Sequence, residues 1–376
     1  MPDEVLERIA AVRELEADVQ RHRADLDAQR RIPATLAQRT AEAGLFRLWL
    51  PRAFGGPQLT VRGLMDVVEE AARRDGSWGW VVTVGATYSR LAGYLSPDVA
   101  REIFDDRNAV IAGSINPTGQ ATRTEDGWRV SGRWAFGSGI HHATWVFGNC
   151  TTEQGEVLSC FVPARDAEVI DTWHVSGLRG TGSCDYIIKD RLVPERYVLR
   201  AFDAKPTQPG TLYALPLITV FATAIAAVPL GIARAAIDEV VDLAGKKTPM
   251  GSKALLRDRE TTQAQIGRAE AELRAGRALL RESVEELWDV VERTGEAPMR
   301  ARALVRLACA YATECCVNVV RRMFDTGGAS ANFTTSPLER CMRDVLAASQ
   351  HIAVVANNYV LGGRVLLGMD PGTPRF

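Results

Sequence analysis

The feature that most constrains the fold is a run from Leu255 to Glu292 in which apolar residues recur at helical spacing. The apolar positions on this stripe are Ile266, Ala269, Leu273, Leu280, Leu287 and Val291. A helix of about 37 residues would be about 55 Å long. Helices of this length are seldom stable alone and normally pack side by side. The sequence therefore predicts a C-terminal four-helix bundle, with its other helices near Leu217–Ala244, Met299–Asp325 and Pro337–Leu367.

The rest of the chain divides into helical and β-rich parts. Helical periodicity and cap signals occupy the first hundred residues, with Pro33 opening one helix and Gly44 closing it. A hairpin follows, in which Asp126-Gly127 joins two β-rich runs. Further strands are expected at Ala109–Ile115, Ala143–Cys150, Val157–Val162 and Cys184–Val193. The prediction is a mainly α protein with a central β domain, a small barrel or sandwich, and domains at 1–107, 108–205 and 206–376.

Charge and cysteine content exclude several classes of protein. The net charge of −1 gives no electrostatic reason to bind nucleic acid or an anionic membrane. No uninterrupted apolar run reaches the roughly 18 residues of a membrane helix, and the charged N-terminus has no secretory core. The seven cysteines include no C-x-x-C pair and the histidines no HExxH, so no metal site is expected. We expect a cytoplasmic protein.

Six segments, taken together, resemble the acyl-CoA dehydrogenase superfamily. They are Gly44–Gly56, Val68–Arg73, Gly127–Gly139, Gly177–Pro194, Gly231–Leu243 and Asp325–Asp344. In that superfamily, dehydrogenases end the helix beginning Arg343-Asp344 with a Tyr-Glu pair whose glutamate is the catalytic base. Here the two positions are His351 and Ile352. A second base position, in the stretch 219–229, also lacks a carboxylate, so the dehydrogenase reaction has lost its base.

The subgroup resemblance is to the flavin-dependent monooxygenases on the same fold, such as the oxygenase components of the 4-hydroxyphenylacetate and hydroxylated secosteroid hydroxylases. It rests on 138–145, 177–183 (GLRGTGS) and 347–351 (AASQH). It implies the oxygenase component of a two-component monooxygenase, a homotetramer that receives reduced FMN or FAD from a separate NAD(P)H-dependent reductase. Oxygen would add to the flavin as a C4a-hydroperoxide and hydroxylate an aromatic or related small molecule.

The resemblance also implies roles for individual residues. Ser138 would contact flavin N5, with Gly139 beside it, or else is a turn serine between two glycines. Phe136 would stack on the flavin ring, or else is a core residue of a strand. Ser114 would contact the substrate hydroxyl, or else is a polar residue at a strand end. His351 lies in an apolar helical pattern, where burial would leave a neutral ring able to accept a proton near pH 7. It would activate the substrate as a base.

The residues expected near the cofactor phosphates match the family less closely. The pair Gly327-Gly328 would let backbone approach a flavin phosphate or adenine, or simply end a helix. Arg257, with the pair Lys246-Lys247, lies near the family's phosphate-binding arginine, but the surrounding motif has changed, which leaves FMN and FAD both open. Four aromatic residues are candidates for a substrate pocket or for the core: Trp78, Trp80, Tyr88 and Phe221.

Three other functions stay open at this point. A dehydrogenase with a displaced base would still oxidise acyl-CoA. An oxygenase of the same fold would attack nitrogen or sulfur instead of an aromatic carbon. A flavin-free scaffold or binding protein is the non-enzymatic alternative, because fold alone does not fix function.

Overall fold

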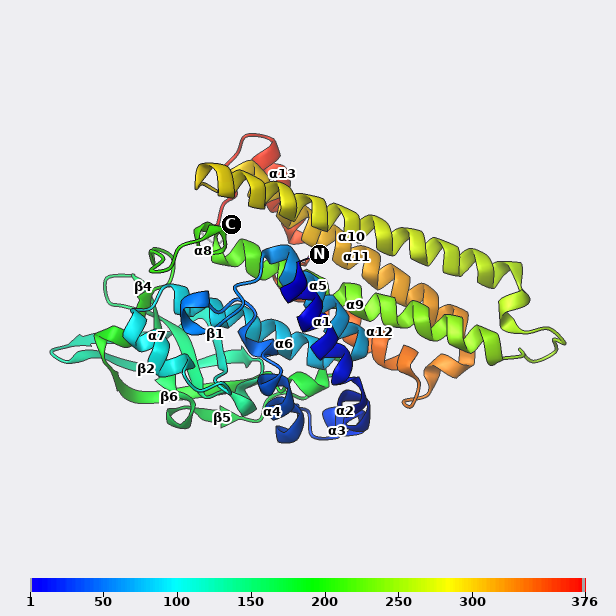
Figure 1. The fold of residues 1–376 in the computed structure, drawn as a ribbon, viewed down its shortest axis with the longest axis horizontal. Helices are drawn as coiled ribbons and strands as arrows, with labels where there is room; N and C mark the ends of the chain where they lie inside the picture. Colours follow the sequence, from blue (N-terminus) through cyan, green and yellow to red (C-terminus); the bar gives the residue numbers. More distant parts are fainter. Residues whose placement is uncertain (1, 374–375) are drawn as a thin grey trace. The chain divides into compact units, whose positions relative to one another are not determined.

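The computed structural model describes residues 2–373 and 376, and these form two compact units. Unit 1 comprises residues 2–60, 81–175 and 179–213, and unit 2 comprises 61–80, 176–178, 214–373 and 376. Helices precede the strands along the chain and follow them again (Figure 1). This order confirms the predicted fold class, a helical protein with a central β region.

Unit 1 begins with short helices, each of which buries the apolar residues on one of its sides. They are α1 (Asp3–Glu14), α2 (Glu16–Arg21), α3 (Arg23–Ala28), α4 (Ala34–Glu42) and, later in the chain, α7 (Pro97–Phe104). Pro33 immediately precedes α4. Gly44 follows the end of the helix with φ of 72°, a left-handed conformation that glycine adopts without steric cost. The predicted start and stop of this helix are therefore confirmed.

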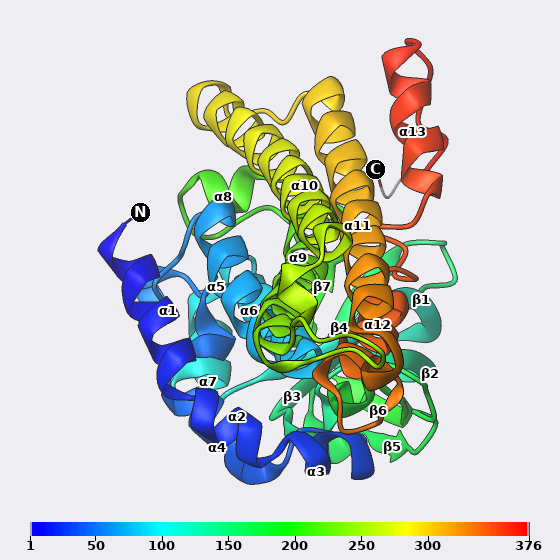
Figure 2. The same cartoon turned by 90° about the vertical axis from the view of Figure 1, so that its right-hand side faces the viewer.

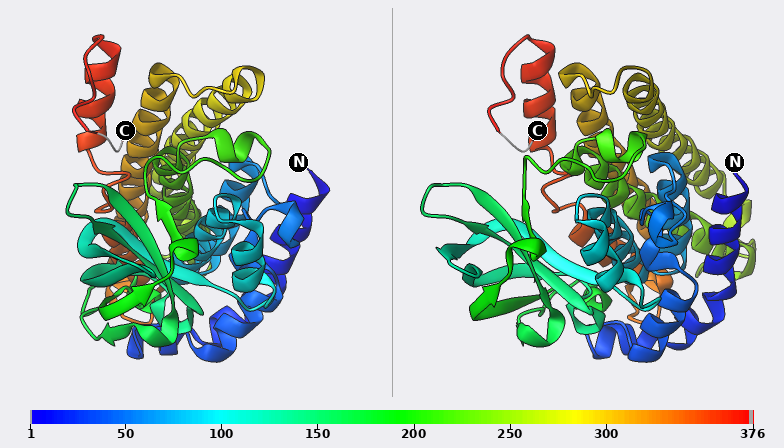
Figure 3. Two further views of the ribbon diagram at one scale, coloured as in Figure 1. Left: turned by 90° about the vertical axis from the view of Figure 1, so that its left-hand side faces the viewer. Right: turned by 60° about the vertical axis from the view of Figure 1, so that its left-hand side comes forward.

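The strands of unit 1 form one seven-stranded sheet in the order β5-β6-β2-β1-β3-β4-β7 (Figure 3). Their bounds are β1 Ile111–Thr124, β2 Gly127–Gly137, β3 Trp145–Thr151, β4 Val157–Pro163, β5 Glu168–Ile170, β6 Cys184–Val193 and β7 Val198–Arg200. The predicted hairpin is present, but its two loop residues are Glu125 and Asp126 instead of Asp126 and Gly127, because Thr124 pairs with Gly127. Strands β1 and β3 run parallel, whereas the other pairs are antiparallel.

Unit 2 contains the long helices. Its members are α5 (Val61–Arg74), α9 (Leu217–Lys246), α10 (Glu260–Thr294), α11 (Met299–Gly327), α12 (Pro337–Ala348) and α13 (Asn357–Leu366). Helices α9, α10 and α11 run side by side (Figures 1 and 2). Helix α6 (Gly76–Ser89) begins in this unit and continues into unit 1. The predicted bundle is present, built on the long α10 stripe.

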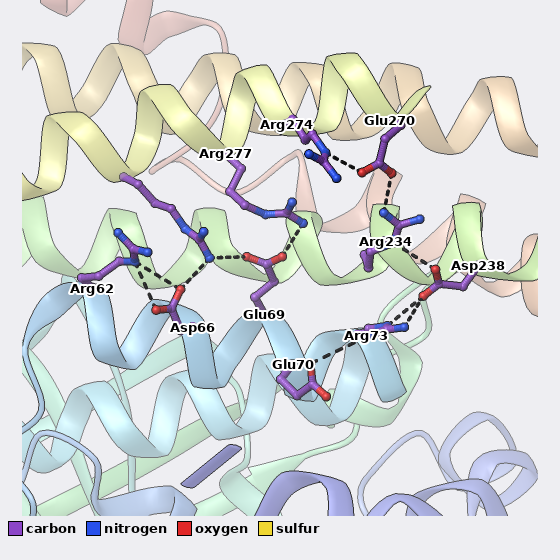
Figure 4. Close-up of polar contacts among 11 residues, drawn as sticks. Arg62, Asp66, Glu69, Glu70, Arg73, Arg234, Asp238, Glu270, Arg274 and Arg277 are labelled. Carbon is purple, nitrogen blue, oxygen red and sulfur yellow. Dashed lines mark hydrogen bonds and ion pairs between the residues drawn. The ribbon is translucent and has the colours of Figure 1, made fainter. Parts of the chain in front are cut away.

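A network of ion pairs joins α5, α9 and α10 on the polar side of these helices (Figure 4). Arg281 on α10 contacts both Asp66 and Glu69 on α5, at 2.6 and 3.6 Å. Arg234 on α9 bonds to Asp238 and to Glu270. Because Asp66 is buried, its charge depends on these arginines more than a surface carboxylate would.

The predicted single helix Pro337–Leu367 is wrong. Helix α12 ends at Ala348, a turn-rich segment covers 349–356, and α13 starts at Asn357. In this segment the amide of Asn358 donates to the carbonyls of Ile352 and Val355, at 3.1 and 2.9 Å. Side-chain hydrogen bonds thus replace part of the helical ladder. His351 consequently lies in a turn.

Helices α9 and α11 are long and apolar enough, by length and composition, to cross a membrane. In unit 2, however, 89% of the apolar window of α9 and 67% of that of α11 is buried against the protein. A core helix of a globular bundle meets the same criterion, because it is apolar on most sides. The apolar character of these helices is thus accounted for by packing inside unit 2.

Candidate active site

The end of β2 turns sharply at Phe136 and presents Ser138. Phe136 has φ of 63°, an uncommon conformation for a bulky residue. The amide of Ser138 donates to the Phe136 carbonyl at 2.8 Å, which closes the turn. Gly139 follows with φ of 75°, and its amide donates to the Thr181 carbonyl at 3.0 Å. Three of the predicted site residues are therefore held in one strained turn of unit 1.

Three buried hydroxyl groups form a chain behind this turn. Ser138 Oγ lies 2.7 Å from Ser183 Oγ, which in turn lies 2.7 Å from Thr181 Oγ1. Ser183 and Thr181 belong to the GLRGTGS segment, in which no individual role was predicted for them. We name Thr181, Ser183 and Ser138 the hydroxyl chain. It fixes the Ser138 side chain through partners that sequence reasoning missed.

The Phe136 side chain projects from the turn and is 65% exposed. Its ring meets the edge of Trp173 at a centroid distance of 6.2 Å. An exposed aromatic ring on strained backbone is suited to stack on a planar ligand. Ser114 lies elsewhere in unit 1, buried on β1 opposite Gly148 of β3, immediately before an irregularity in their pairing.

His351 occupies the turn after α12 in unit 2. Its ring contacts Trp80 edge-on at a centroid distance of 5.5 Å and Phe221 at 5.8 Å. Phe221 is on α9, and Trp80 on α6. Two of the four aromatic candidates therefore surround the histidine, whereas Trp78 is fully buried and Tyr88 donates to the Gly113 carbonyl in unit 1. Ile352 beside the histidine is 67% exposed.

Burial lowers the pKa of His351 to about 4, so the imidazole is neutral at pH 7. The amide of Ala353 donates to His351 Nδ1 at 3.2 Å. In a neutral ring one nitrogen accepts and the other carries the proton. This contact therefore assigns the proton to Nε2, which makes Nε2 a hydrogen-bond donor.

A buried charge cluster anchors the helix that leads to His351. Asp344 Oδ1 on α12 accepts the Leu178 amide at 2.6 Å, and Arg340 Nε lies 2.9 Å from Asp75. Burial, with the nearby Asp75, raises the pKa of Asp344, while Arg340 acts in the opposite direction. Arg343-Asp344 was identified from sequence only as part of a family motif. Here Asp344 ties α12 to the segment that precedes the hydroxyl chain in sequence.

The residues predicted to bind phosphate lie in two settings, a helix end at Gly327-Gly328 and an exposed position at Arg257. Gly327 ends α11, and Gly328 follows with φ of 59°. Lys247 donates to the Gly327 carbonyl and to Ser330, at 2.8 and 2.9 Å, which caps the helix. Arg257 is exposed, with the Asp258 carboxylate 3.9 Å away.

A polar pocket of about 520 Å³ opens beside α10 and α11. Arg259, Arg321 and Arg322 line it, together with Thr262 and Asn318. Arg322 is held by Gln265 and Glu272. Arg257 does not line this pocket, although its neighbours Leu256 and Arg259 do. The arginines of the pocket had no signal in the sequence, because they come together only when α10 and α11 pack.

Comparisons with known proteins agree with this architecture. The family described as Acyl-CoA dehydrogenase, N-terminal domain matches residues 2–99, and Acyl-CoA dehydrogenase, C-terminal domain matches residues 223–356. Indole-3-acetate monooxygenase of Pseudomonas putida is 29% identical over 351 residues, which are 92% of this chain and 90% of that protein. The oxygenase subunit HsaA, a flavin-dependent monooxygenase of Rhodococcus jostii, is 30% identical over 340 residues, 86% of this chain and 88% of HsaA.

Solved structures give the same result. XiaF from Streptomyces sp., in complex with FADH2 and glycerol, superposes with a TM-score of 0.92 at 27% identity. The match covers 99% of this chain and 98% of XiaF. This chain belongs to the flavin-dependent monooxygenases of the acyl-CoA dehydrogenase superfamily.

Proposed function

We propose that this chain is the oxygenase component of a two-component monooxygenase that hydroxylates an aromatic small molecule. The observation that carries the proposal is the imidazole of His351 held between Trp80 and Phe221. In the dehydrogenases of the superfamily, the neighbouring position, here Ile352, holds the base. An isoleucine cannot remove a proton, whereas the flanking aromatic rings suit a planar, apolar substrate.

His351 would act on the substrate by hydrogen bonding. Because Ala353 occupies Nδ1, the neutral ring offers its Nε2 proton to an oxygen atom. A phenol bound there would have its oxygen oriented by this hydrogen bond, and its hydroxyl proton would have to leave as the ring is hydroxylated. To act as a base through Nε2, His351 would first have to lose the hydrogen bond from Ala353 and carry its proton on Nδ1.

Unit 1 would hold the reactive part of the cofactor. Phe136 offers an exposed ring for stacking, Ser138 a hydroxyl for N5, and Gly139 a close backbone approach. Bound reduced flavin supplies the electrons that activate dioxygen. The residues of the turn orient it, and the hydroxyl chain keeps the Ser138 proton directed. Ser114 is proposed to contact the substrate hydroxyl.

Unit 2, considered by itself, offers a separate candidate site for phosphate oxygens. The pocket beside α10 and α11 combines Arg259 and Arg321 with neutral donors, a set suited to phosphate oxygens, and its lining also includes one carboxylate, Asp325. A volume of about 520 Å³ exceeds what one phosphate needs, which supports FAD over FMN. Gly327-Gly328 and Arg257 are proposed to contribute from the neighbouring backbone and surface.

The remaining parts of the proposal concern assembly and location. A separate NAD(P)H-dependent reductase would supply the reduced flavin, since the names of relatives such as HsaA mark them as oxygenase subunits. The active protein would be a homotetramer, as the resemblance implies, and we place it in the cytoplasm.

The test is product formation linked to NAD(P)H oxidation. The purified chain, a generic flavin reductase and FAD are mixed with a panel of phenols and indoles, and hydroxylated product and oxygen uptake are both measured. The His351→Ala variant should bind reduced FAD as tightly as the wild type yet form product about 100-fold more slowly. Anaerobic bleaching of bound FAD by an acyl-CoA, with no product from any aromatic compound, would contradict the proposal.

A further inference from the structure

A second pocket of about 700 Å³ lies in unit 1, between the start of α4 and the loop after β2. Its walls are largely apolar and include Ile32, Ala37, Phe46 and Val110, all buried. We call it the Phe46 pocket. Neither Ser138 nor Phe136 lines it, so it is not the surface proposed for the flavin.

His142 is a polar group in the wall of the Phe46 pocket. Its ring stacks on Phe46 at a centroid distance of 5.3 Å. Its Nε2 is buried and has no hydrogen-bond partner among the described residues. Burial, followed by the neighbouring His141, lowers the pKa of His142 to about 4, so the ring is neutral at pH 7. A buried nitrogen without a hydrogen-bond partner destabilises the folded protein.

Positive charge gathers at the rim of the same pocket. Arg31 lines it and is exposed, and within residues 2–373 and 376 it makes no ion pair. Burial lowers the pKa of His141, another lining residue, and Arg31 lowers it further, whereas Asp171, which pairs with Arg30 and does not line the pocket, acts in the opposite direction. No aspartate or glutamate of the described chain lines the pocket. The rim therefore favours an anion.

We propose that the Phe46 pocket binds a small aromatic carboxylate. The carboxylate would pair with Arg31, and the aromatic ring would cover Ile32 and Phe46, next to the His142 ring. The volume lies within the range of small-molecule sites, and an apolar cavity with few polar groups is their usual composition. This site goes beyond the proposed oxygenase function and does not depend on it.

The ligand of this pocket would be an effector of the Ser138 turn. A Cβ atom on Gly139 would fall 3.1 Å from both Cε1 and Nε2 of His142, so the imidazole packs directly against Gly139. Gly139 is adjacent to Ser138 in the chain. A ligand that packs against the His142 ring would thereby stabilise the turn that holds the serine.

Calorimetric titration of phenylacetate into the flavin-free protein tests the proposal. We expect saturable binding in the wild type, at least tenfold weaker binding of the uncharged 2-phenylethanol, and at least tenfold weaker phenylacetate binding in Arg31→Gln. Arg165→Gln removes an exposed charge of unit 1 outside the pocket and should change nothing.

Ala37→Phe provides an independent test, because it fills the pocket without altering charge. It should also abolish binding of phenylacetate. Absence of binding to the wild type up to about 10 mM overturns the proposal. Affinity that is unchanged in Arg31→Gln overturns it as well, since phenylacetate would then occupy another site.

Discussion

The hydroxyl oxygens of Ser138 and Ser183 lie 2.7 Å apart in the interior of unit 1, and Ser183 has Thr181 as its next partner. Each hydroxyl has one proton to donate. If Ser138 donates to the flavin, Ser183 must donate to Ser138 and Thr181 to Ser183. The chain therefore has one direction in the functional state, and its first two members determine where the Ser138 proton points.

Removal of Ser183 should uncouple oxygen use from product formation. In Ser183→Ala, Ser138 loses its donor, and its own proton is free to rotate away from the cofactor. Loss of a hydrogen bond that contributes about 1.4 kcal/mol to orienting the hydroxyl corresponds to roughly a tenfold rise in hydrogen peroxide per molecule of product. Peroxide and product are measured per NADH consumed. Thr181→Val, one step further from Ser138, should show a smaller rise, and an unchanged ratio in both variants would contradict the ordering.

His351 should make the protein sensitive to acid. The pKa of the histidine falls from its usual 6.5 to about 4 in the folded protein, so the unfolded chain binds more protons between these values. Stability that is fully present above pH 6.5 is then lost as the pH falls toward 4. In His351→Gln the drop in unfolding free energy between about pH 7 and pH 5 should be smaller by at most about 2 kcal/mol.

Denaturant unfolding at the two pH values measures this difference. His174→Gln replaces an exposed histidine of unit 1 and serves as the control. If His351→Gln and the wild type lose equal stability on acidification, the imidazole is not buried as the structure shows.

Much of the fold could be predicted from sequence because it depends on local signals. Strand β6 has the predicted bounds Cys184–Val193, and the start of α9 at Leu217 also agrees. The parallel pairing of β1 with β3 was not predictable, since it joins segments separated by a strand and a loop. Strand alternation defines faces but not partners.

The break at His351 could not be predicted for a different reason. The stretch Arg343–Val360 contains neither glycine nor proline, the usual signals that end a helix. The break depends instead on side chains that bond to backbone groups. His351 accepts the amide of Ala353, and the side chain of Asn358 donates to two backbone carbonyls. Sequence placed His351 inside a helix and assigned it the role of a base because burial would keep its ring neutral. The structure instead places it in a turn, where the Ala353 amide occupies Nδ1.

The arginine pocket of unit 2 predicts a difference between the two flavins. In Arg259→Ala and Arg321→Ala, loss of charge-assisted hydrogen bonds should weaken reduced FAD about tenfold for each substitution. Reduced FMN should be affected less if its single phosphate does not reach the pocket. Anaerobic titration followed by flavin fluorescence measures both affinities. Arg274→Ala, an exposed residue of α10 outside the pocket, is the control. Equal losses for FMN and FAD would place the FMN phosphate in this pocket and remove the argument for FAD.

Asp344 should give the opposite pH dependence from His351. Burial raises the pKa of its carboxyl, so the folded protein retains a proton that the unfolded chain has lost. The unfolding free energy then falls as the pH rises above the ordinary aspartate pKa. Asp344→Asn still accepts the Leu178 amide but has no charge to desolvate. Relative to the wild type, it should gain about 1 kcal/mol or more between about pH 5 and pH 8.

The control for Asp344→Asn is Glu339→Gln, which removes only the partly exposed ion pair with Arg343. Such a pair contributes less than about 0.5 kcal/mol. A wild type and an Asp344→Asn variant with parallel stability profiles across this pH range would mean that Arg340 fully compensates the buried carboxylate.

Phe136 should show a conflict between stability and function. Its φ of 63° costs little for glycine but is strained for any residue with a Cβ. Phe136→Gly should therefore be more stable than Phe136→Ala by about 1 kcal/mol, although both lose the same ring. Both should bind reduced flavin about tenfold more weakly than the wild type, since the stacking surface is gone. Thermal unfolding and flavin titration of the two variants measure these effects, and equal stabilities would show that the left-handed turn at Phe136 does not persist in solution.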